Sequence, residues 1–487
     1  MAFDAITLTA LMPELEGLIG NRVVRVHQPS PLEIVITMRG QQGNVRLFIS
    51  AHPERARLHL TTASYTNPAQ PPNFCMYLRR HLEGSRLERL TRPESERIIH
   101  FHFARRDELG DERELLLIVE TMGRHSNIIV VNSKDNTIMA AIKPITPTMS
   151  RYRQVLPGLL YKSPPPQNKL HLSDLTELDF YSRLAKEGQR PAKALLSTVA
   201  GLSPKWAEEL VARAQLPESL NVRTASRSEL VPLWQETTAL REKLLEANFE
   251  PMIYFENQGQ AVAVAPLPLV RYARLPVKHF PTMSAALDYY FGAKEKEMQF
   301  AALYQSLSTK LRHEIERVEK KRSLHIEAFQ SAGKADRYRK FGELLLAHAY
   351  QLPTLGQTEV KLEDWDNPEA EVLVPLDPAL TPVENAQRYF HRYTKAKKTR
   401  TVARRQKKRD EAELAYLESV LVALEEASTL PDLEEIKIEL EKEGYIKKKT
   451  THRRKQDKVP PESEPHAFII GNYKVLVGRN NRQISSS

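Results

Sequence analysis

Between residues 22 and 142, short apolar runs are separated by turn residues. Polar and apolar positions do not alternate regularly within these runs, as in Ile34-Val35-Ile36. This is typical of strands that are buried on both sides or that close a small sandwich or barrel. We expect strands at residues 23–27, 33–38, 45–50, 97–103, 114–120, 127–131 and 137–142.

One helical pattern interrupts these strands. It begins after Pro72, since proline is tolerated at the first turn of a helix, and it ends at Gly84. Phe74, Tyr77 and Leu82 share its apolar face. The sequence therefore predicts a compact α+β domain, with helices packed against a mostly antiparallel sheet.

A second region is helical. It follows a proline-rich segment at 156–167, which has no apolar periodicity and is typical of a linker. Helical patterns at 191–200 and 205–214 are joined by the turn Gly201-Leu202-Ser203-Pro204. Such a turn can expose backbone N–H groups to a phosphate, as in a helix-hairpin-helix, but an ordinary helical hairpin fits the pattern equally well.

Two long amphipathic stretches occupy most of the remaining chain. In the first, at 294–324, leucine, isoleucine and valine recur every three or four residues from Leu303 to Val318. The second covers 385–443 and repeats leucine in the same way from Leu414 to Leu424. We expect an antiparallel coiled-coil hairpin. The segment between the arms, with a helix at 338–350 and a strand at 359–362, is expected to form a small domain at its far end.

Composition narrows the possible classes. The 487 residues carry 71 Lys+Arg against 61 Asp+Glu, a net charge of +10, and 41% of them are hydrophobic. This composition excludes wholesale disorder and favours a polyanionic partner. No run of 18 apolar residues is present, and Asp4 stands where a signal peptide would be basic or apolar. A single cysteine, Cys75, favours a reducing, cytosolic setting without disulfides or a cysteine-based zinc site.

The positive charge is concentrated on the second arm. Residues 388–409 contain eleven Lys or Arg and no Asp or Glu, beside Tyr389, Phe390 and Tyr393. A solvated helix face usually mixes both signs, so a single-sign block favours phosphate binding, although a solvated face remains an alternative. A second basic run at 447–458 lacks apolar residues and is expected to be a flexible linker that also touches nucleic acid.

Catalytic motifs are absent from the sequence. It has no phosphate-binding glycine loop, no zinc-protease motif and no hydrolase elbow, so we expect no enzyme, no metal and no cofactor. Polar residues do gather beside two predicted strands: Glu96-Arg97 leads into one, and Arg124 and His125 lie in a turn between two others. They offer donors to phosphates or base edges, but a hairpin turn with internally paired charges is the alternative.

Several segments, in the same order along the chain, resemble the NFACT family. They are Ser50-Ala51-His52-Pro53, Pro71-Pro72-Asn73-Phe74-Cys75-Met76, Met122-Gly123-Arg124-His125-Ser126-Asn127 and Leu380-Thr381-Pro382-Val383-Glu384-Asn385. The resemblance implies a multidomain α+β fold. Its parts would be a glycosylase-like NFACT-N domain (1–170), a helix-hairpin-helix domain that returns to NFACT-N (171–285), coiled-coil arms (286–330 and 384–445), a middle domain (331–383), a basic linker (446–467) and the start of a truncated NFACT-R domain (468–487).

The resemblance also implies a function. Family members bind large (50S) ribosomal subunits obstructed by peptidyl-tRNA and recruit alanyl-tRNA, so that an alanine tail is added without mRNA. The family's acidic-Arg pair aligns with Glu96-Arg97, where Asp-Arg is more common. We therefore expect Glu96, Arg97, Arg124 and His125 to bind tRNA in the cytoplasm. For 23S rRNA we expect Lys395, Lys397, Lys398, Arg400, Arg404 and Arg405.

Two other functions remain open on sequence grounds. A fibronectin-binding surface adhesin requires export, and no signal or anchor is visible. A DNA glycosylase, which the NFACT-N domain resembles, would require an N-terminal proline and a zinc finger. This chain has Ala2-Phe3 and one cysteine instead.

Overall fold

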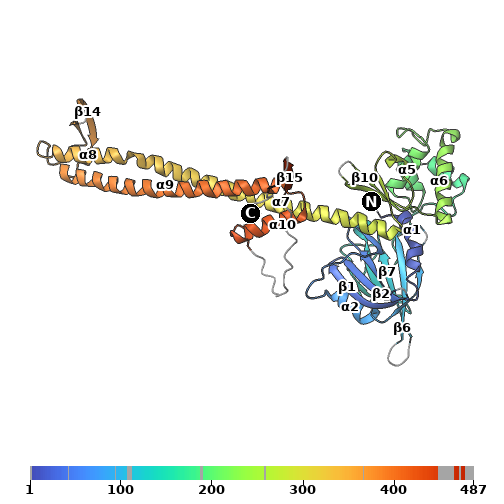
Figure 1. The fold of residues 1–487 in the computed structure, drawn as a ribbon. Helices are drawn as coiled ribbons and strands as arrows, with labels where there is room; N and C mark the ends of the chain where they lie inside the picture. The colour runs from blue at the N-terminus through green and yellow to red at the C-terminus, as the bar shows by residue number, and fades with distance from the viewer. Residues whose placement is uncertain are drawn as a thin grey trace. The chain divides into compact units, whose positions relative to one another are not determined.

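The computed structural model describes residues 3–41, 43–93, 95–106, 112–186, 190–256, 259–365, 367–447, 466–470 and 473–477. The chain forms two compact units, unit 1 (residues 1–295) and unit 2 (residues 296–487) (Figure 1). The basic run at 447–458 lies outside the described residues, apart from Lys447.

A nine-stranded antiparallel sheet forms the centre of unit 1, in the order β4-β3-β2-β1-β5-β6-β7-β8-β9. Its strands are β1 (Arg22–Ser30), β2 (Glu33–Gly40), β3 (Gly43–Ser50), β4 (Arg57–Leu60), β5 (Arg86–Thr91), β6 (Ile98–Arg106), β7 (Glu112–Glu120), β8 (Asn127–Asn132) and β9 (Ile138–Ala141). The predicted antiparallel sheet is confirmed. The sequence missed β4 and β5, because β4 has only four residues and most of β5 is polar.

One face of the sheet carries the largest core. It packs against α1 (Ala5–Glu16), α2 (Asn73–Leu82) and the first turns of α7 (Met283–Ser331), with Leu11, Phe101 and Leu287 fully buried. Cys75 is also buried there, and burial raises the pKa of its thiol. The apolar face of α2 therefore has the role that its sequence periodicity indicates.

A smaller core, which includes Ile118, Ile129 and Val155, lies along β6 to β9. The proline-rich segment was expected to be a linker throughout, and its first half is not. The N–H of Ile138 donates to the carbonyl of Leu159 at 2.7 Å, so the segment is hydrogen-bonded beside β9. The sequence did not reveal this because the segment pairs through its backbone and not through an apolar repeat.

The helical region of unit 1 has its own core around Phe180, Leu195, Trp206 and Leu233. Its elements are α3 (Glu177–Leu184), α4 (Pro191–Thr198), α5 (Pro204–Arg213) and α6 (Arg227–Glu246), followed by the three-stranded sheet of β10 (Met252–Phe255), β11 (Ala261–Ala265) and β12 (Val277–His279). Two short helices thus lie where the sequence predicts a helical hairpin.

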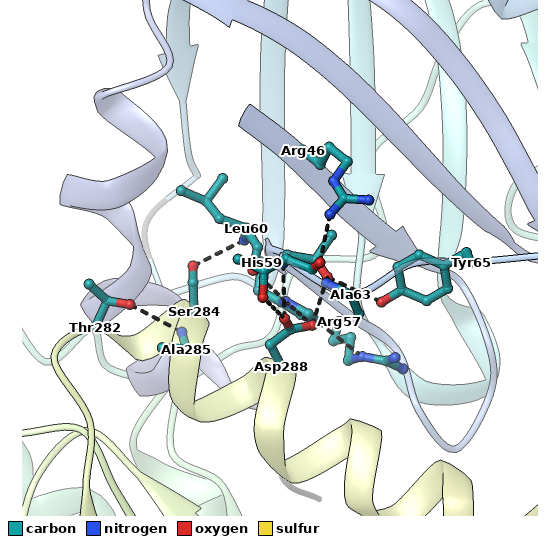
Figure 2. Close-up of polar contacts among 12 residues, drawn as sticks. Arg46, Arg57, His59, Leu60, Ala63, Tyr65, Thr282, Ser284, Ala285 and Asp288 are labelled. Atoms are coloured by element: carbon teal, nitrogen blue, oxygen red, sulfur yellow. Dashed lines mark hydrogen bonds and ion pairs between the residues drawn. The ribbon is translucent and has the colours of Figure 1, made fainter. Parts of the chain in front are cut away.

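The first turns of α7 are held by polar groups from elsewhere in unit 1 (Figure 2). The Asp288 carboxylate accepts hydrogen bonds from the Thr61 hydroxyl (2.7 Å) and the Thr62 N–H (3.0 Å). The Ser284 hydroxyl accepts one from the N–H of Leu60 at 3.0 Å, and Glu14 accepts one from the N–H of Met283 at 2.7 Å. The start of α7 is therefore fastened to β4 and to α1.

Unit 2 is built on two long antiparallel helices, the rest of α7 and α9 (Pro382–Glu426) (Figure 1). Leu307 and Leu311 pack with Leu414 and Leu417 in their shared core. Two ion pairs between these helices show that they run antiparallel: Lys321 Nζ lies 3.0 Å from Asp410 Oδ1, and Arg317 Nη2 lies 3.7 Å from Glu413 Oε1. The leucine repeats in the sequence thus correctly indicate the faces through which α7 and α9 pack on each other.

The segment between the arms extends this helix pair. A 3-10 turn (Ala332–Lys334) leads into α8 (Ala335–Ala347), and Phe341 of α8 packs on Tyr389 of α9. A two-stranded sheet of β13 (Glu359–Asp364) and β14 (Asn367–Pro375) completes the segment. A further hairpin, β15 (His466–Ile470) with β16 (Tyr473–Val477), lies where the start of the NFACT-R domain is expected, while residues 471–472 and 478–487 of that segment lie outside the described residues.

The expected single helix over 385–443 is wrong, since it breaks after Glu426. Ala427 is extended, and α10 (Leu430–Lys442) begins with Thr429 as its N-cap. The Tyr416 hydroxyl donates to Glu439 at 3.0 Å, and the Tyr445 hydroxyl donates to Glu413 at 3.4 Å, so α10 runs back antiparallel to α9. The physical reason is a capping box, in which Thr429 and Asp432 satisfy each other's backbone N–H groups.

Candidate functional site

The strand register brings the four predicted tRNA-binding residues to one end of the large sheet. Ile98 at the start of β6 pairs with Glu120 at the end of β7, which in turn pairs with Asn127 at the start of β8. Glu96-Arg97 lies just before β6, and Arg124-His125 lies in the turn between β7 and β8. Both pairs are therefore at the same end of the sheet.

Arg97 is held by its backbone and placed among carboxylates. Its carbonyl accepts hydrogen bonds from the Thr121 N–H (2.8 Å) and the Thr121 hydroxyl (2.9 Å). Burial lowers the pKa of the Arg97 guanidinium, while the charges of Asp4 and Glu96 act in the opposite direction. The sequence did not indicate Asp4, which is 93 positions away along the chain.

Arg124 and His125 lie on a 3-10 turn (Gly123–His125), and both are exposed. Gly123 supplies the bend with a φ of 60°. Arg124 Nε donates to His125 Nε2 at 3.0 Å, and in the part of the chain that the structure describes neither side chain lies within ion-pair distance of a carboxylate. The alternative of a turn with internally paired charges therefore does not apply to Arg124.

Buried groups behind this turn are joined by hydrogen bonds. Arg153 Nη2 donates to Glu120 Oε2 at 2.6 Å, and the Tyr161 hydroxyl donates to Glu120 Oε1 at 2.9 Å. Burial and the Glu120 carboxylate both raise the pKa of Tyr161. Lys143 Nζ donates to the carbonyl of Ala51 at 3.0 Å. Neither Arg153 nor Tyr161 could be found from the sequence, because they reach Glu120 across 33 and 41 residues and not through a local pattern.

The turn between α4 and α5 packs at the same place. Asp4 accepts hydrogen bonds from the Thr7 N–H and from the Ser203 hydroxyl, both at 2.8 Å, and its Oδ2 lies 3.4 Å from Lys205 Nζ. Burial alone would raise the pKa of Asp4, but Lys205 and the hydrogen bonds outweigh it and hold the pKa below its usual value. Gly201 has a φ of 78°, and a side chain there would begin 3.3 Å from the carbonyl oxygen of Ser95.

A cavity of about 330 Å³ opens beside this turn. Arg92 and Arg241 line it together with Ser95 and Gly201. Arg92 also donates to the carbonyls of Glu96 (3.1 Å) and Ala5 (3.0 Å), so it fixes the backbone next to Arg97.

The described residues contain no group of three or more His, Cys, Asp or Glu side chains that could hold a metal ion. The exposed guanidinium of Arg124 and imidazole of His125 at one sheet end are suited to binding an anion.

The basic block of α9 is largely a solvent-facing surface. Tyr389 is buried against Phe341, and its hydroxyl donates to the carbonyl of Pro375 at 2.6 Å, so this ring has a structural role and is not exposed for stacking on bases. All six predicted rRNA-binding residues are exposed, namely Lys395, Lys397, Lys398, Arg400, Arg404 and Arg405.

Comparison with known proteins gives consistent matches. The family model for the NFACT N-terminal and middle domains matches residues 4–459. The chain is 32% identical over 491 residues to the Rqc2 homolog RqcH of Bacillus subtilis, covering 99% of this chain and 82% of that protein. It is 25% identical over 373 residues to the archaeal Rqc2 homolog aRqcH of Methanocaldococcus jannaschii, covering 74% and 52%.

Among solved structures, the fibrinogen binding protein from Staphylococcus aureus matches with a TM-score of 0.50 and 27% identity, over 60% of this chain and 99% of that one. In the described residues, no helix has the length and apolar character needed to cross a membrane. The match of the NFACT model over most of the chain, and the near full-length similarity to RqcH, show that this chain belongs to the NFACT family.

Proposed function

We propose that this protein is a ribosome-associated quality-control factor. It binds 50S subunits obstructed by peptidyl-tRNA and recruits alanyl-tRNA, so that the stalled chain receives a C-terminal alanine tail without mRNA. Membership of the NFACT family and the similarity to Rqc2 homologs support this proposal. Because these subunits occur in the cytoplasm, the proposal places the protein there.

The observation that carries the proposal is the meeting of separate segments at one end of the sheet. Arg97, Arg124 and His125 lie there beside the turn at Gly201. Phosphates are bound by guanidinium groups, and Arg97 and Arg124 supply two of them at this sheet end. We assign tRNA to this surface.

In this proposal the protein is not an enzyme. Peptidyl transfer belongs to the ribosome, and the protein contributes by holding tRNA where the reaction can occur. The exposed basic side chains of α9 would bind 23S rRNA, where each neutralised phosphate releases counterions.

A double substitution, Glu96→Ala with Arg97→Ala, tests the tRNA site. We expect the variant to lose co-purifying tRNA while its recovery with 50S subunits is unchanged, because α9 is untouched. The measurement is sequencing and quantification of RNA after purification from cells. Arg223→Ala, a change at an exposed arginine of unit 1, is the control and should retain tRNA. Undiminished tRNA in the double variant would show that this pair is not the binding site.

A second candidate is a surface adhesin, because a solved relative is named as a fibrinogen binding protein. Fractionation of cells that express the chain, followed by binding to immobilised fibrinogen, separates the two candidates. Recovery mainly at the cell surface would favour the adhesin, and recovery with 50S subunits would favour the quality-control factor.

A further inference from the structure

Three arginines lie side by side across the large sheet, at the end away from Glu96-Arg97. In the strand register, Arg22 of β1 is directly opposite Arg39 of β2 and also directly opposite Arg86 of β5. All three side chains are exposed. We call this set the arginine row. Residues opposite each other on neighbouring strands are about 5 Å apart and project from the same face, so the row places three positive charges close together.

This arrangement is unfavourable within the chain itself. Like charges directly opposite each other destabilise a sheet. In the part of the chain that the structure describes, no carboxylate lies within ion-pair distance of the three side chains. The nearby Glu83 is engaged elsewhere: it accepts from the N–H of Val26 at 3.1 Å, and its Oε2 lies 3.7 Å from Arg25 Nη1. Among the described residues, no ion pair therefore offsets the repulsion between the three arginines.

Two members of the row have no internal role among the described residues. Arg22 does have one, since its Nε donates to the carbonyl of Gly84 at 2.9 Å. The guanidinium groups of Arg39 and Arg86 donate no hydrogen bond within the described part of the chain. A guanidinium has five donors in a planar fork, so both groups are available to a partner outside the chain.

The choice of residue also points to a phosphate partner. Residues 1–133 contain sixteen arginines and no lysine, and the first lysine of the chain is Lys134. Lysine would serve equally well for solubility, whereas the arginine fork binds a phosphate through two parallel hydrogen bonds. A surface that uses arginine alone is therefore more suited to phosphate recognition than to general solvation.

The arginine row is separate from the candidate tRNA site. Arg86 pairs with Ala104 near the end of β6, whereas Arg97 lies just before Ile98 at its start. Six residues of extended strand separate the two ends, a distance of about 20 Å. Successive residues of β6 point to opposite faces, so Arg97 shares the face of Ile99, which packs against the helices, and the arginine row lies on the other face. An RNA arm has phosphates along its whole length, so one that contacts the exposed Arg124-His125 turn at the sheet end can follow this other face to the row.

We propose that the arginine row is a second contact surface for tRNA, which binds the phosphate backbone of the same molecule that contacts the Arg124-His125 turn. This inference rests on the proposed tRNA binding of the chain and adds the surface that would orient the tRNA. Two neutralised phosphates, at Arg39 and Arg86, contribute about 1.4 to 1.8 to the slope of log affinity against log salt.

The test is a salt series of tRNA binding for the whole chain, with deacylated bulk tRNA as the probe. Arg39→Gln with Arg86→Gln should weaken binding about 20-fold at 0.15 M salt and reduce the slope by about 1.4 to 1.8. The melting temperature should stay the same or rise, because the substitution relieves repulsion. This last readout distinguishes a lost contact from a damaged fold.

Two further variants make the result specific. Arg223→Gln with Arg274→Gln removes two exposed arginines of unit 1 outside the row and should leave the slope near that of the natural sequence. Arg39→Lys with Arg86→Lys keeps the charge, so it should keep the slope while losing part of the affinity.

The proposal is overturned if the row variant binds tRNA like the natural sequence, or if the control pair weakens binding equally. It is also overturned if the row variant loses only retention on immobilised polyglutamate, which would assign the row to an acidic protein. If the natural sequence itself binds no tRNA, the proposed function fails together with this inference. An unaffected row variant alone leaves the proposed function standing.

Discussion

At the scale of single residues, His59 is held neutral by its neighbours (Figure 2). Arg57 Nε, which can only donate, lies 3.3 Å from His59 Nε2, so that nitrogen accepts. Nδ1 then carries the proton and donates to the carbonyl of Leu60 at 2.9 Å. Burial first, and then the charge of Arg57, lowers the pKa of His59 to about 4.

This pKa predicts how stability depends on pH. Since the pKa of folded His59 lies below the ordinary histidine value of 6.5, the unfolded chain binds the proton more readily. The contribution of neutral His59 is complete above about pH 6.5 and is lost as the pH falls towards 4, a difference of about 3 kcal/mol. Urea unfolding of the natural sequence and of His59→Gln at several pH values would measure it. The variant should show a flatter pH dependence between 4 and 6.5, and parallel curves would contradict the assignment.

Residue patterns indicated part of the candidate site. Glu96, Arg97, Arg124 and His125 stand next to predicted strands, so antiparallel pairing could place them at one sheet end. Their supports could not be found in this way, because Asp4, Ser203 and Arg153 reach the site through contacts between distant segments. Periodicity reports on local structure and gives no information on such contacts.

At the scale of secondary-structure elements, periodicity predicted the strands with many apolar residues and the faces of α2, α7 and α9. It failed at β5, where polar residues outnumber the two leucines. It also failed at Glu426, because the leucine repeat continues into α10 and suggests one helix. The local signal for the break is the pair Thr429 and Asp432. The pair can be recognised as a helix cap only when the chain is known to turn back at this point.

The capping pair gives a prediction at this scale. Thr429→Ala removes the hydroxyl that accepts from the Asp432 N–H and should lower the free energy of unfolding by about 1 kcal/mol. Tyrosine fluorescence during urea unfolding is a suitable measurement, because Tyr416 of α9 stacks on Tyr445, which follows the end of α10. Thr394→Ala, at an exposed position of α9, is the matched control and should not lower the free energy of unfolding. Equal effects of the two substitutions would argue against the cap.

At the scale of the whole molecule, the net charge of +10 is distributed as separate basic surfaces. One lies on the sheet of unit 1 and another on α9 of unit 2. Composition alone predicted a polyanionic partner, but it could not distinguish these surfaces, because the arginine row exists only through strand register. Each surface can therefore be altered separately.

A triple substitution on α9 tests this separation. Lys395→Gln, Lys397→Gln and Lys398→Gln should reduce the salt slope of 50S binding by about 2 to 3, because three phosphate contacts are lost. Binding of free tRNA to unit 1 should not change. Lys296→Gln with Lys320→Gln, at exposed positions on α7, is the control and should alter neither measurement. A parallel loss of tRNA binding in the triple variant would mean that the two surfaces act on one RNA.

The carboxylate of Glu14 caps the start of α7, although the two partners are 269 residues apart. At a synthesis rate of about 5 to 20 residues per second, roughly 15 to 50 s pass between the synthesis of Glu14 and that of its partner in α7. The sheet's apolar face also stays partly uncovered until Leu287 has left the exit tunnel. A protein proposed to act on stalled ribosomes thus passes through a long, aggregation-prone interval of its own while it is being translated.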